Sequence, residues 1–213
     1  MSSTRDDFLS AARAAADLLR DPAVAAAWRK PSALPEFSVG GLAGHLAYQI
    51  LGVPQALTGP APQEQTISLL DHYARALWTD AALDDDINVR IRNGGEELAV
   101  DGPEALVTRV DAAVTELADL LASEAGGRSV RLPFWGPWSL RLDDLLITRM
   151  MELAVHSDDL AVSVGAATPT LPQSAVDTVV DLLSRLAVRR HGATAVLRAL
   201  SRAERTPASI AAF

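Results

Sequence analysis

Apolar residues recur every three to four positions over most of this chain, and short polar segments rich in Gly and Pro separate the repeating stretches. That spacing is typical of helices with one buried face. It predicts helices at about residues 5–20, 39–57, 63–83, 103–124, 142–164 and 174–190, with a short helix near 194–203. A Pro- and Trp-rich connector separates the helices at 103–124 and 142–164. The pattern therefore predicts an all-α protein.

The helix predicted at 142–164 differs from the others because a narrow polar stripe follows an otherwise apolar surface. At 100° per residue the stripe contains Leu145, Arg149, Glu152, His156, Asp159 and Ser163. So wide an apolar arc indicates a central helix, where charged groups need partners or a metal ion. The alternative is that the stripe faces solvent and forms ordinary ion pairs at i,i+3 spacing. Taken alone, this helix favours the solvent-facing alternative.

Glu152 and His156 stand four residues apart, so both side chains project from one face of the helix. His45 lies on another predicted helix, which follows Ser38 as a plausible N-cap. It contains three small residues that allow another backbone or a ligand to come close: Gly40, Gly41 and Gly44. A lone histidine on an apolar face is more often a hydrogen-bonded core residue. Together, however, two nitrogens and one carboxylate can hold a divalent metal and leave one coordination position open, as catalytic zinc sites do.

Two motifs carry a resemblance to a known family. Ser38-Val-x-x-Leu42-x-x-His45-Leu is followed by Arg149-x-x-Glu152-x-x-x-His156-x-x-Asp159-Leu-Ala. The pair resembles the mycothiol-dependent maleylpyruvate isomerase-like proteins of the DinB/YfiT superfamily, most clearly over residues 38–165. One position departs from the family, because many relatives carry Trp where this chain has Asp158.

The resemblance implies a four-helix bundle that holds one divalent metal, usually zinc. On this chain it implies a metal-binding bundle over residues 1–165 and a small helical extension over 166–213. The ligands it implies are His45, Glu152 and His156. Asp159 would orient a ligand histidine without binding the metal itself, and Arg149 is a second candidate for the catalytic site.

The chain contains no cysteine, so any thiol in its chemistry must come from a cofactor. The resemblance implies mycothiol or a similar low-molecular-weight thiol. Bound at the metal, the thiol would add to an electrophilic small molecule, in an isomerase or an S-transferase. Two alternatives use the same three ligands: a bundle that binds a metal or ligand without turnover, and a hydrolase in which the metal activates water.

Charge and composition restrict the partners. A net charge of −8 argues against nucleic acid, which requires a basic surface. No apolar run is long enough for a membrane span, and the first residues lack a signal-peptide pattern, which predicts a cytoplasmic protein. The sequence is compatible with a homodimer.

The remaining histidines and a group of arginines are weaker candidates. His72 is expected at the surface or behind the metal ligands, and His191 at the C-terminal end of a helix, where cations are favoured. Four arginines near the C-terminus could bind an anionic substrate, although surface charge is the more ordinary role of each: Arg189, Arg190, Arg198 and Arg202.

Overall fold

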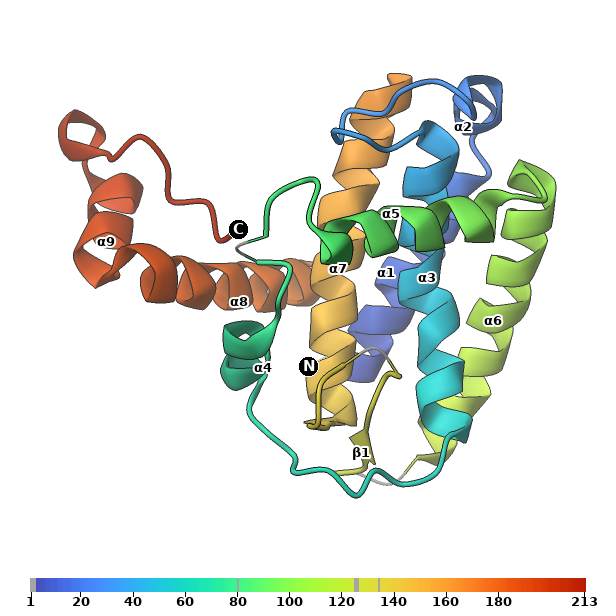
Figure 1. Cartoon of the computed structure of the whole chain (residues 1–213), viewed down its shortest axis with the longest axis horizontal. Coiled ribbons are helices and arrows are strands. Elements are labelled where there is room, and N and C mark those ends of the chain that lie inside the picture. The colour runs from blue at the N-terminus through green and yellow to red at the C-terminus, as the bar shows by residue number, and fades with distance from the viewer. Residues whose placement is uncertain (1–2, 80, 125–126, 134) are drawn as a thin grey trace.

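Four long helices lie side by side in the computed structural model (Figure 1). They are α1 (Thr4–Leu19), α3 (Val39–Thr58), α6 (Pro103–Ser123) and α7 (Leu142–Val164). Each packs against two neighbours in the order α1, α6, α3, α7 and back to α1. Their buried faces form one continuous core of Leu, Val, Ile and Ala side chains. The predicted all-α bundle is therefore confirmed.

Shorter elements surround this bundle, and the structure describes residues 3–79, 81–124, 127–133 and 135–213. The shorter elements are α2 (Pro22–Ala27), α4 (Leu69–Arg75), α5 (Asp86–Ala99), β1 (Ser129–Val130), β2 (Leu140–Arg141), α8 (Gln173–His191), α9 (Ala193–Ser201) and the 3-10 turn η1 (Ala203–Arg205). β1 and β2 pair antiparallel across the connector before α7. No helix in the described ranges is long and apolar enough to cross a membrane.

Local sequence signals set the ends of the two helices that carry the candidate ligands. The Ser38 hydroxyl accepts a hydrogen bond from the Gly41 N–H at 2.8 Å, so Ser38 caps α3 as predicted. Helix α7 ends at Gly165, which adopts the left-handed conformation with φ of 69°. Glycine reaches this conformation without a steric penalty, and it commonly ends helices in this way. The predicted limits of α7 match the structure.

Helix α5 crosses the outer surface of α3 (Figure 1), and two glycines of α3, Gly41 and Gly44, face it. A methyl group at Gly44 would overlap the carbonyl oxygen of Gly95 in α5. One at Gly41 would overlap the side chain of Glu96, which accepts a hydrogen bond from the Ser38 hydroxyl at 2.7 Å. The close backbone approach expected from the small residues of α3 is therefore confirmed.

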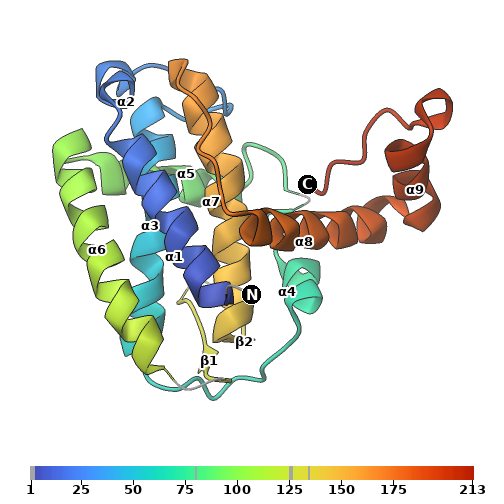
Figure 2. The same ribbon diagram turned by 180° about the vertical axis from the view of Figure 1, so that it is seen from behind.

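The C-terminal helices project sideways from the bundle, as seen from both sides in Figures 1 and 2. Helix α8 begins after the linker at residues 166–172 and packs its buried face against α7 and α1. Gly192, with φ of 82°, separates α8 from α9. His191 ends α8 as predicted, and its Nε2 lies 2.8 Å from the carbonyl oxygen of Ala211. A separate domain at residues 166–213 stays a prediction.

One predicted element is wrong in extent, and two helices were not predicted. Only residues 69–75 of the predicted helix at 63–83 are helical. The segment before it pairs with the connector instead: Ile67 N–H donates to the carbonyl of Ser139, and Ser139 N–H donates to that of Gln65. Helices α5 and α2 were not predicted. The α5 sequence contains Gly94 and Gly95, which weaken an isolated helix, so packing on α3 accounts for its stability.

Candidate metal centre

His45, Glu152 and His156 converge in the interior between α3 and α7. Their donor atoms all lie within 4.8 Å of one another. The Glu152 carboxylate is 3.0 Å from His156 Nε2 and 3.8 Å from His45 Nε2. The two imidazole rings meet edge to face, with centroids 4.7 Å apart. The structure thus brings together the three candidate ligands that the sequence predicted, although His45 precedes Glu152 by 107 positions in the chain.

The polar stripe of α7 faces the bundle, and part of its apolar surface faces solvent. Arg149 is only 8% exposed, whereas Val162 on the other side of the helix is 62% exposed. The solvent-facing alternative for the stripe is therefore wrong. Hydrophobic periodicity could not distinguish the two, because it shows that one face of the helix is polar and does not show whether that face meets solvent or the interior of a bundle.

A hydrogen bond with His156 and a longer contact with His45 determine the charge of Glu152. Burial by itself would favour the neutral acid, but contacts with His156 and His45 hold the pKa of Glu152 well below its ordinary value. The positive charge of Arg149 acts in the same direction. Glu152 is therefore a carboxylate throughout the neutral range, the form in which it can bind a cation.

The two histidines differ in protonation. Burial opposes a charge on His156, yet hydrogen bonds to Asp159 and Glu152 raise its pKa to about 9. The Asp159 contact is made by His156 Nδ1 at 2.9 Å. Burial lowers the pKa of His45, although Glu152 opposes that shift. With no metal bound, His156 is therefore a positively charged imidazolium at neutral pH, whereas His45 is neutral.

The buried side chain of Gln49 links Arg149 to His45 by hydrogen bonds. The Arg149 guanidinium donates to the amide oxygen of Gln49 at 2.6 Å and to the hydroxyl of Thr148 at 3.0 Å. The amide nitrogen of Gln49 in turn donates to the His45 carbonyl at 2.9 Å and lies 3.4 Å from His45 Nε2. Sequence reasoning missed Gln49, which is 1% exposed. Its i,i+4 spacing from His45 was the available signal.

His72 is buried, so the expectation that it lies at the surface is wrong. Trp138 Nε1 donates to His72 Nδ1 at 3.1 Å, and the Trp135 ring packs 4.7 Å from the imidazole. Burial, with a contribution from the charge of Arg149, lowers the pKa of His72 to about 4. The connector tryptophans thus hold α4 against the bundle with a neutral histidine.

The donor set fits a divalent metal. Ligands at zinc bond lengths of 2.0–2.2 Å in a tetrahedron stand about 3.4 Å apart. The two separations from the Glu152 carboxylate, 3.0 and 3.8 Å, bracket that value. If His156 donates its Nδ1 proton to Asp159, its Nε2 is left free to bind a metal. Three protein donors would leave one of the four positions for another ligand.

Comparison with protein families gives a match over most of the bundle. Residues 8–161 match the model of the mycothiol maleylpyruvate isomerase N-terminal domain. The chain belongs to this family. Its fold is also similar to the crystal structure of a histidine-to-alanine mutant of mycothiol-dependent maleylpyruvate isomerase, with a TM-score of 0.53 and 14% identity. That likeness covers 92% of this chain and 75% of the other. No curated protein matches the chain.

Asp158, where the sequence departs from the family motif, contacts the linker after α7. Asp158 is exposed and accepts a hydrogen bond from the Thr168 hydroxyl at 2.5 Å. It therefore holds the linker after α7 and does not contribute to the centre. Two of the C-terminal arginines are similarly engaged, because Arg189 and Arg190 donate to the carbonyls of Leu70 and Thr79 around α4.

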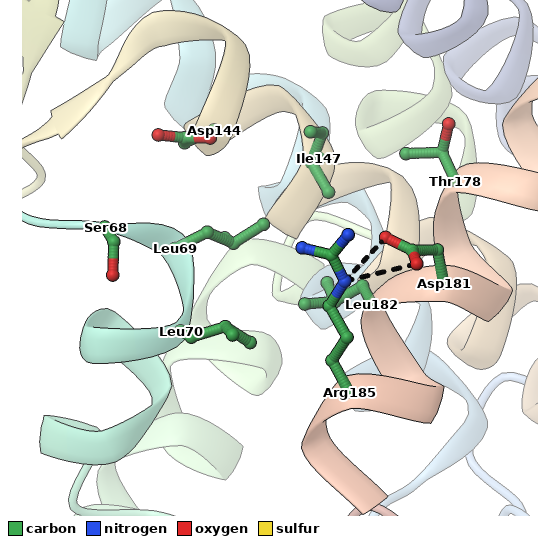
Figure 3. Close-up of a pocket in the computed structure, with 9 residues that line it drawn as sticks. All are labelled: Ser68, Leu69, Leu70, Asp144, Ile147, Thr178, Asp181, Leu182 and Arg185. Carbon is green, nitrogen blue, oxygen red and sulfur yellow. Dashed lines mark hydrogen bonds and ion pairs between the residues drawn. The ribbon is translucent and has the colours of Figure 1, made fainter. Parts of the chain in front are cut away.

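A hollow of about 330 Å³ between α4, α7 and α8 is separate from the candidate centre. Figure 3 shows Ile147 and Leu69 on its walls and Arg185 paired with Asp181 at 3.0 Å. None of the three candidate ligands lines it. The exposed Arg185–Asp181 pair is an ordinary i,i+4 surface pair.

Proposed function

We propose that the chain is a metal-dependent enzyme that activates a low-molecular-weight thiol, mycothiol or a close analogue, for addition to an electrophilic small molecule. The convergence of His45, Glu152 and His156 within 4.8 Å carries the proposal. Membership of the mycothiol maleylpyruvate isomerase N-terminal domain family supports the thiol, and the absence of cysteine means that the sulfur comes from outside the chain.

The donor set favours zinc as the metal, because two imidazoles and one carboxylate with an open fourth position are typical of catalytic zinc. A metal ion held there would bind the thiol sulfur and lower the thiol pKa from about 8.5, so that the nucleophilic thiolate forms at neutral pH. Glu152 adds a negative charge to the site, which reduces the net charge that the bound ion presents.

The other residues of the centre orient the ligands. Asp159 holds the His156 ring through Nδ1 and so directs Nε2 towards Glu152. Arg149 fixes Gln49, which holds the backbone carbonyl of His45. Arg149 also supplies a buried positive charge beside the site, where an anionic or polarised group of the substrate would be stabilised.

Addition of the thiolate would convert a carbon–carbon double bond of the substrate into a single bond that rotates freely. Elimination after rotation releases the geometric isomer, as in an isomerase. Retention of the carbon–sulfur bond, with a proton delivered to the neighbouring carbon, gives the conjugate, as in an S-transferase. Either outcome uses the same metal ligands and the same thiol.

Metal content of the purified protein tests the centre. We expect about one zinc or similar divalent ion per chain by elemental analysis, lost in His45→Ala and in His156→Ala. His191→Ala is the matched control, since His191 lies at the end of α8, contacts the Ala211 carbonyl and is not one of the three candidate ligands, so the variant should retain the ion. Helical circular dichroism should be unchanged in all three variants. Full metal occupancy in both ligand variants would contradict the proposed centre.

Turnover assays then test the reaction class. Metal-loaded protein should consume an α,β-unsaturated carbonyl compound only in the presence of the thiol, with mycothiol compared against glutathione. Turnover of an ester or amide without thiol would instead establish a hydrolase. Stoichiometric metal with no turnover of any electrophile would indicate a bundle that binds a metal or ligand without catalysing a reaction.

A further inference from the structure

The loop at residues 31–38, between α2 and α3, contains a backbone conformation that its sequence does not favour. Glu36 has φ of 64°, and among the described residues it is the only one other than glycine with a positive φ. The Phe37 N–H closes the turn by donating to the Leu34 carbonyl at 3.2 Å, and Pro35 occupies the second position. Such a turn prefers Gly or Asn where this chain has Glu. Strain of this kind persists only where the surrounding structure holds it, and it clusters at functional sites.

Hydrogen bonds within the loop leave the Phe37 backbone little freedom. The Phe37 carbonyl accepts a hydrogen bond from the Ser32 N–H at 2.9 Å, so both polar groups of its backbone are bound inside the loop. At the base of the loop, Pro31 and Ser38 form an antiparallel bridge. The strained turn therefore fixes the point at which the Phe37 side chain leaves the backbone.

The Phe37 ring packs against His45, the candidate ligand on α3. The ring centroids lie 5.8 Å apart and the planes are inclined at 53°, within the range of favourable aromatic pairs. His45 Nδ1 makes no hydrogen bond to any residue that the structure describes. His156 differs, because Asp159 holds its Nδ1 at 2.9 Å. Ring packing thus restrains His45 on the side where a hydrogen bond restrains His156.

The same loop reaches α7 near the second candidate histidine. The Ala33 N–H donates to the Ser163 hydroxyl at 2.8 Å, and that hydroxyl donates to the Asp159 carbonyl at 2.6 Å. Asp159 in turn holds the His156 ring. The loop therefore adjoins both histidines, one directly and the other through two residues of α7.

We propose that Phe37 is a positioning residue that holds the His45 ring in its metal-binding orientation, and that the turn at Glu36 keeps Phe37 in place. The inference rests on the proposed function, because it concerns the same metal centre. His45 Nε2 lies 3.4 Å from the amide nitrogen of Gln49, a contact that Nε2 gives up when it binds a metal. The packing of Phe37 does not use that nitrogen and is kept. A ring that is already ordered loses less entropy on binding, which raises affinity.

Phe37→Leu tests the ring, because it keeps a large apolar side chain in the loop. Zinc affinity, measured by competition with a chromophoric chelator, should fall roughly 2- to 10-fold, the range for ordering one side chain on binding. Phe37→Tyr keeps the ring and should retain the wild-type affinity. Equal zinc affinity in Phe37→Leu and the wild type would overturn the role of Phe37.

Leu34→Ala is the matched control for the loop. Leu34 lies in the same turn and is also partly buried against the core. Because the hydrogen bonds of the turn are made by the backbone, the variant should melt at a lower temperature and keep the zinc affinity of the wild type. A fall in zinc affinity equal to that of Phe37→Leu would mean that any loosening of the loop has this effect, and would overturn a specific role of the Phe37 ring.

Substitutions at Glu36 test the turn while the ring is left in place. Glu36→Gly accepts a positive φ without strain, so it should keep the zinc affinity of the wild type and melt at the same temperature or higher. Valine is β-branched and is a steric outlier at positive φ, so Glu36→Val should rearrange the turn and weaken zinc binding as Phe37→Leu does. Both variants lose the same carboxylate, so charge does not account for a difference between them. Equal zinc affinities would contradict the role of the turn.

Motion of the His45 ring provides a readout that needs no metal. In metal-free protein labelled with ¹³C in its histidine rings, NMR relaxation should show greater picosecond–nanosecond motion of His45 in Phe37→Leu than in the wild type. Phe37→Tyr should restore the wild-type rigidity. The His156 ring, held by Asp159, should be equally rigid in all three proteins. A loop that contributes only to stability would leave both rings unchanged, and that result would overturn the proposal.

The outcomes separate this inference from the proposed function. Zinc affinity that depends on the Phe37 ring, with no thiol-dependent turnover of any electrophile, would support the positioning role and contradict the enzyme. Thiol-dependent turnover with zinc affinity unchanged in Phe37→Leu would support the enzyme and contradict the positioning role. If the wild type binds no zinc, both are wrong.

Discussion

Gly44 of α3 and Gly95 of α5 bring the backbones of the two helices into direct contact. A methyl group on either residue would overlap the other helix: one at Gly44 meets the carbonyl oxygen of Gly95, and one at Gly95 meets that of Gly41. The contact lies beside His45, whose backbone nitrogen is also among the atoms that a side chain at Gly95 would touch. Helix α5 can cover the His45 segment only because neither position carries a side chain.

Gly44→Ala and Gly95→Ala should therefore each destabilise the protein by about 1–3 kcal/mol, because the added methyl forces the helices apart. The matched control is Gly94→Ala, where a methyl would meet nothing within 4 Å. That variant should gain about 0.5–1 kcal/mol, since alanine is the better helix former. Urea unfolding of the three variants measures the difference. Similar effects at positions 94 and 95 would contradict the close contact.

Zinc affinity should depend on pH through His156. The metal must displace the proton that His156 shares with Asp159 and Glu152, and the pKa of His156 in the metal-free protein is about 9. Apparent affinity should thus rise about tenfold per pH unit below that value and level off near pH 9. An ordinary histidine would level off near 6.5. Competition titrations with a chromophoric chelator from pH 6 to 10 give the curve.

Asp159→Asn supplies the control for that curve. It removes one of the two carboxylates that stabilise the imidazolium, so the plateau should begin at a lower pH than in the wild type. Affinity on the plateau itself should fall by up to roughly 10-fold, because a neutral amide accepts the Nδ1 hydrogen bond more weakly than a carboxylate does. An unchanged onset of the plateau would show that Asp159 does not set the protonation of His156.

His72 should make the protein sensitive to mild acid. Its pKa is about 4 in the fold and 6.5 for the model side chain, so the unfolded chain takes up the proton first as pH falls. The stability that the neutral ring contributes is complete above pH 6.5 and is lost as pH falls from 6.5 to 4. A shift of this size corresponds to about 3 kcal/mol.

The matched variant is His72→Gln, which keeps an acceptor for Trp138 but does not titrate. Between pH 7 and pH 4 the wild type should lose about 3 kcal/mol more unfolding free energy than the variant. Tryptophan fluorescence of urea titrations follows it. A difference that is constant over this range would mean that His72 titrates normally in the fold.

Arg149→Lys should reduce stability although it preserves the charge. Lysine cannot donate to both the Gln49 amide oxygen and the Thr148 hydroxyl with the planar geometry of a guanidinium. A buried acceptor left without its donor costs about 1–3 kcal/mol. Arg185→Lys, at an exposed ion pair, is the control and should change stability by less than about 0.5 kcal/mol. Equal effects in the two variants would contradict the buried role of Arg149.

Local patterns sufficed for the helices that carry the ligands. The limits of α7 and the Ser38 cap of α3 follow from residues within one or two turns, because caps, glycine stops and apolar spacing act at short range. The spacing of Glu152 and His156 likewise follows from one helical turn. The predicted helix at 63–83 failed for the complementary reason, since its first part is held by Ser139, more than seventy residues away.

The sequence by itself determined an all-α chain, the positions of its long helices and a candidate set of His45, Glu152 and His156. Only the tertiary structure decided that the polar stripe of α7 faces inward, that α5 lies on α3, and that Gln49 adjoins the centre. The physical reason is the distance along the chain over which each kind of interaction acts. Helical spacing and capping depend on neighbouring residues, whereas burial, pKa and hydrogen-bond partners depend on which distant surfaces the fold brings into contact.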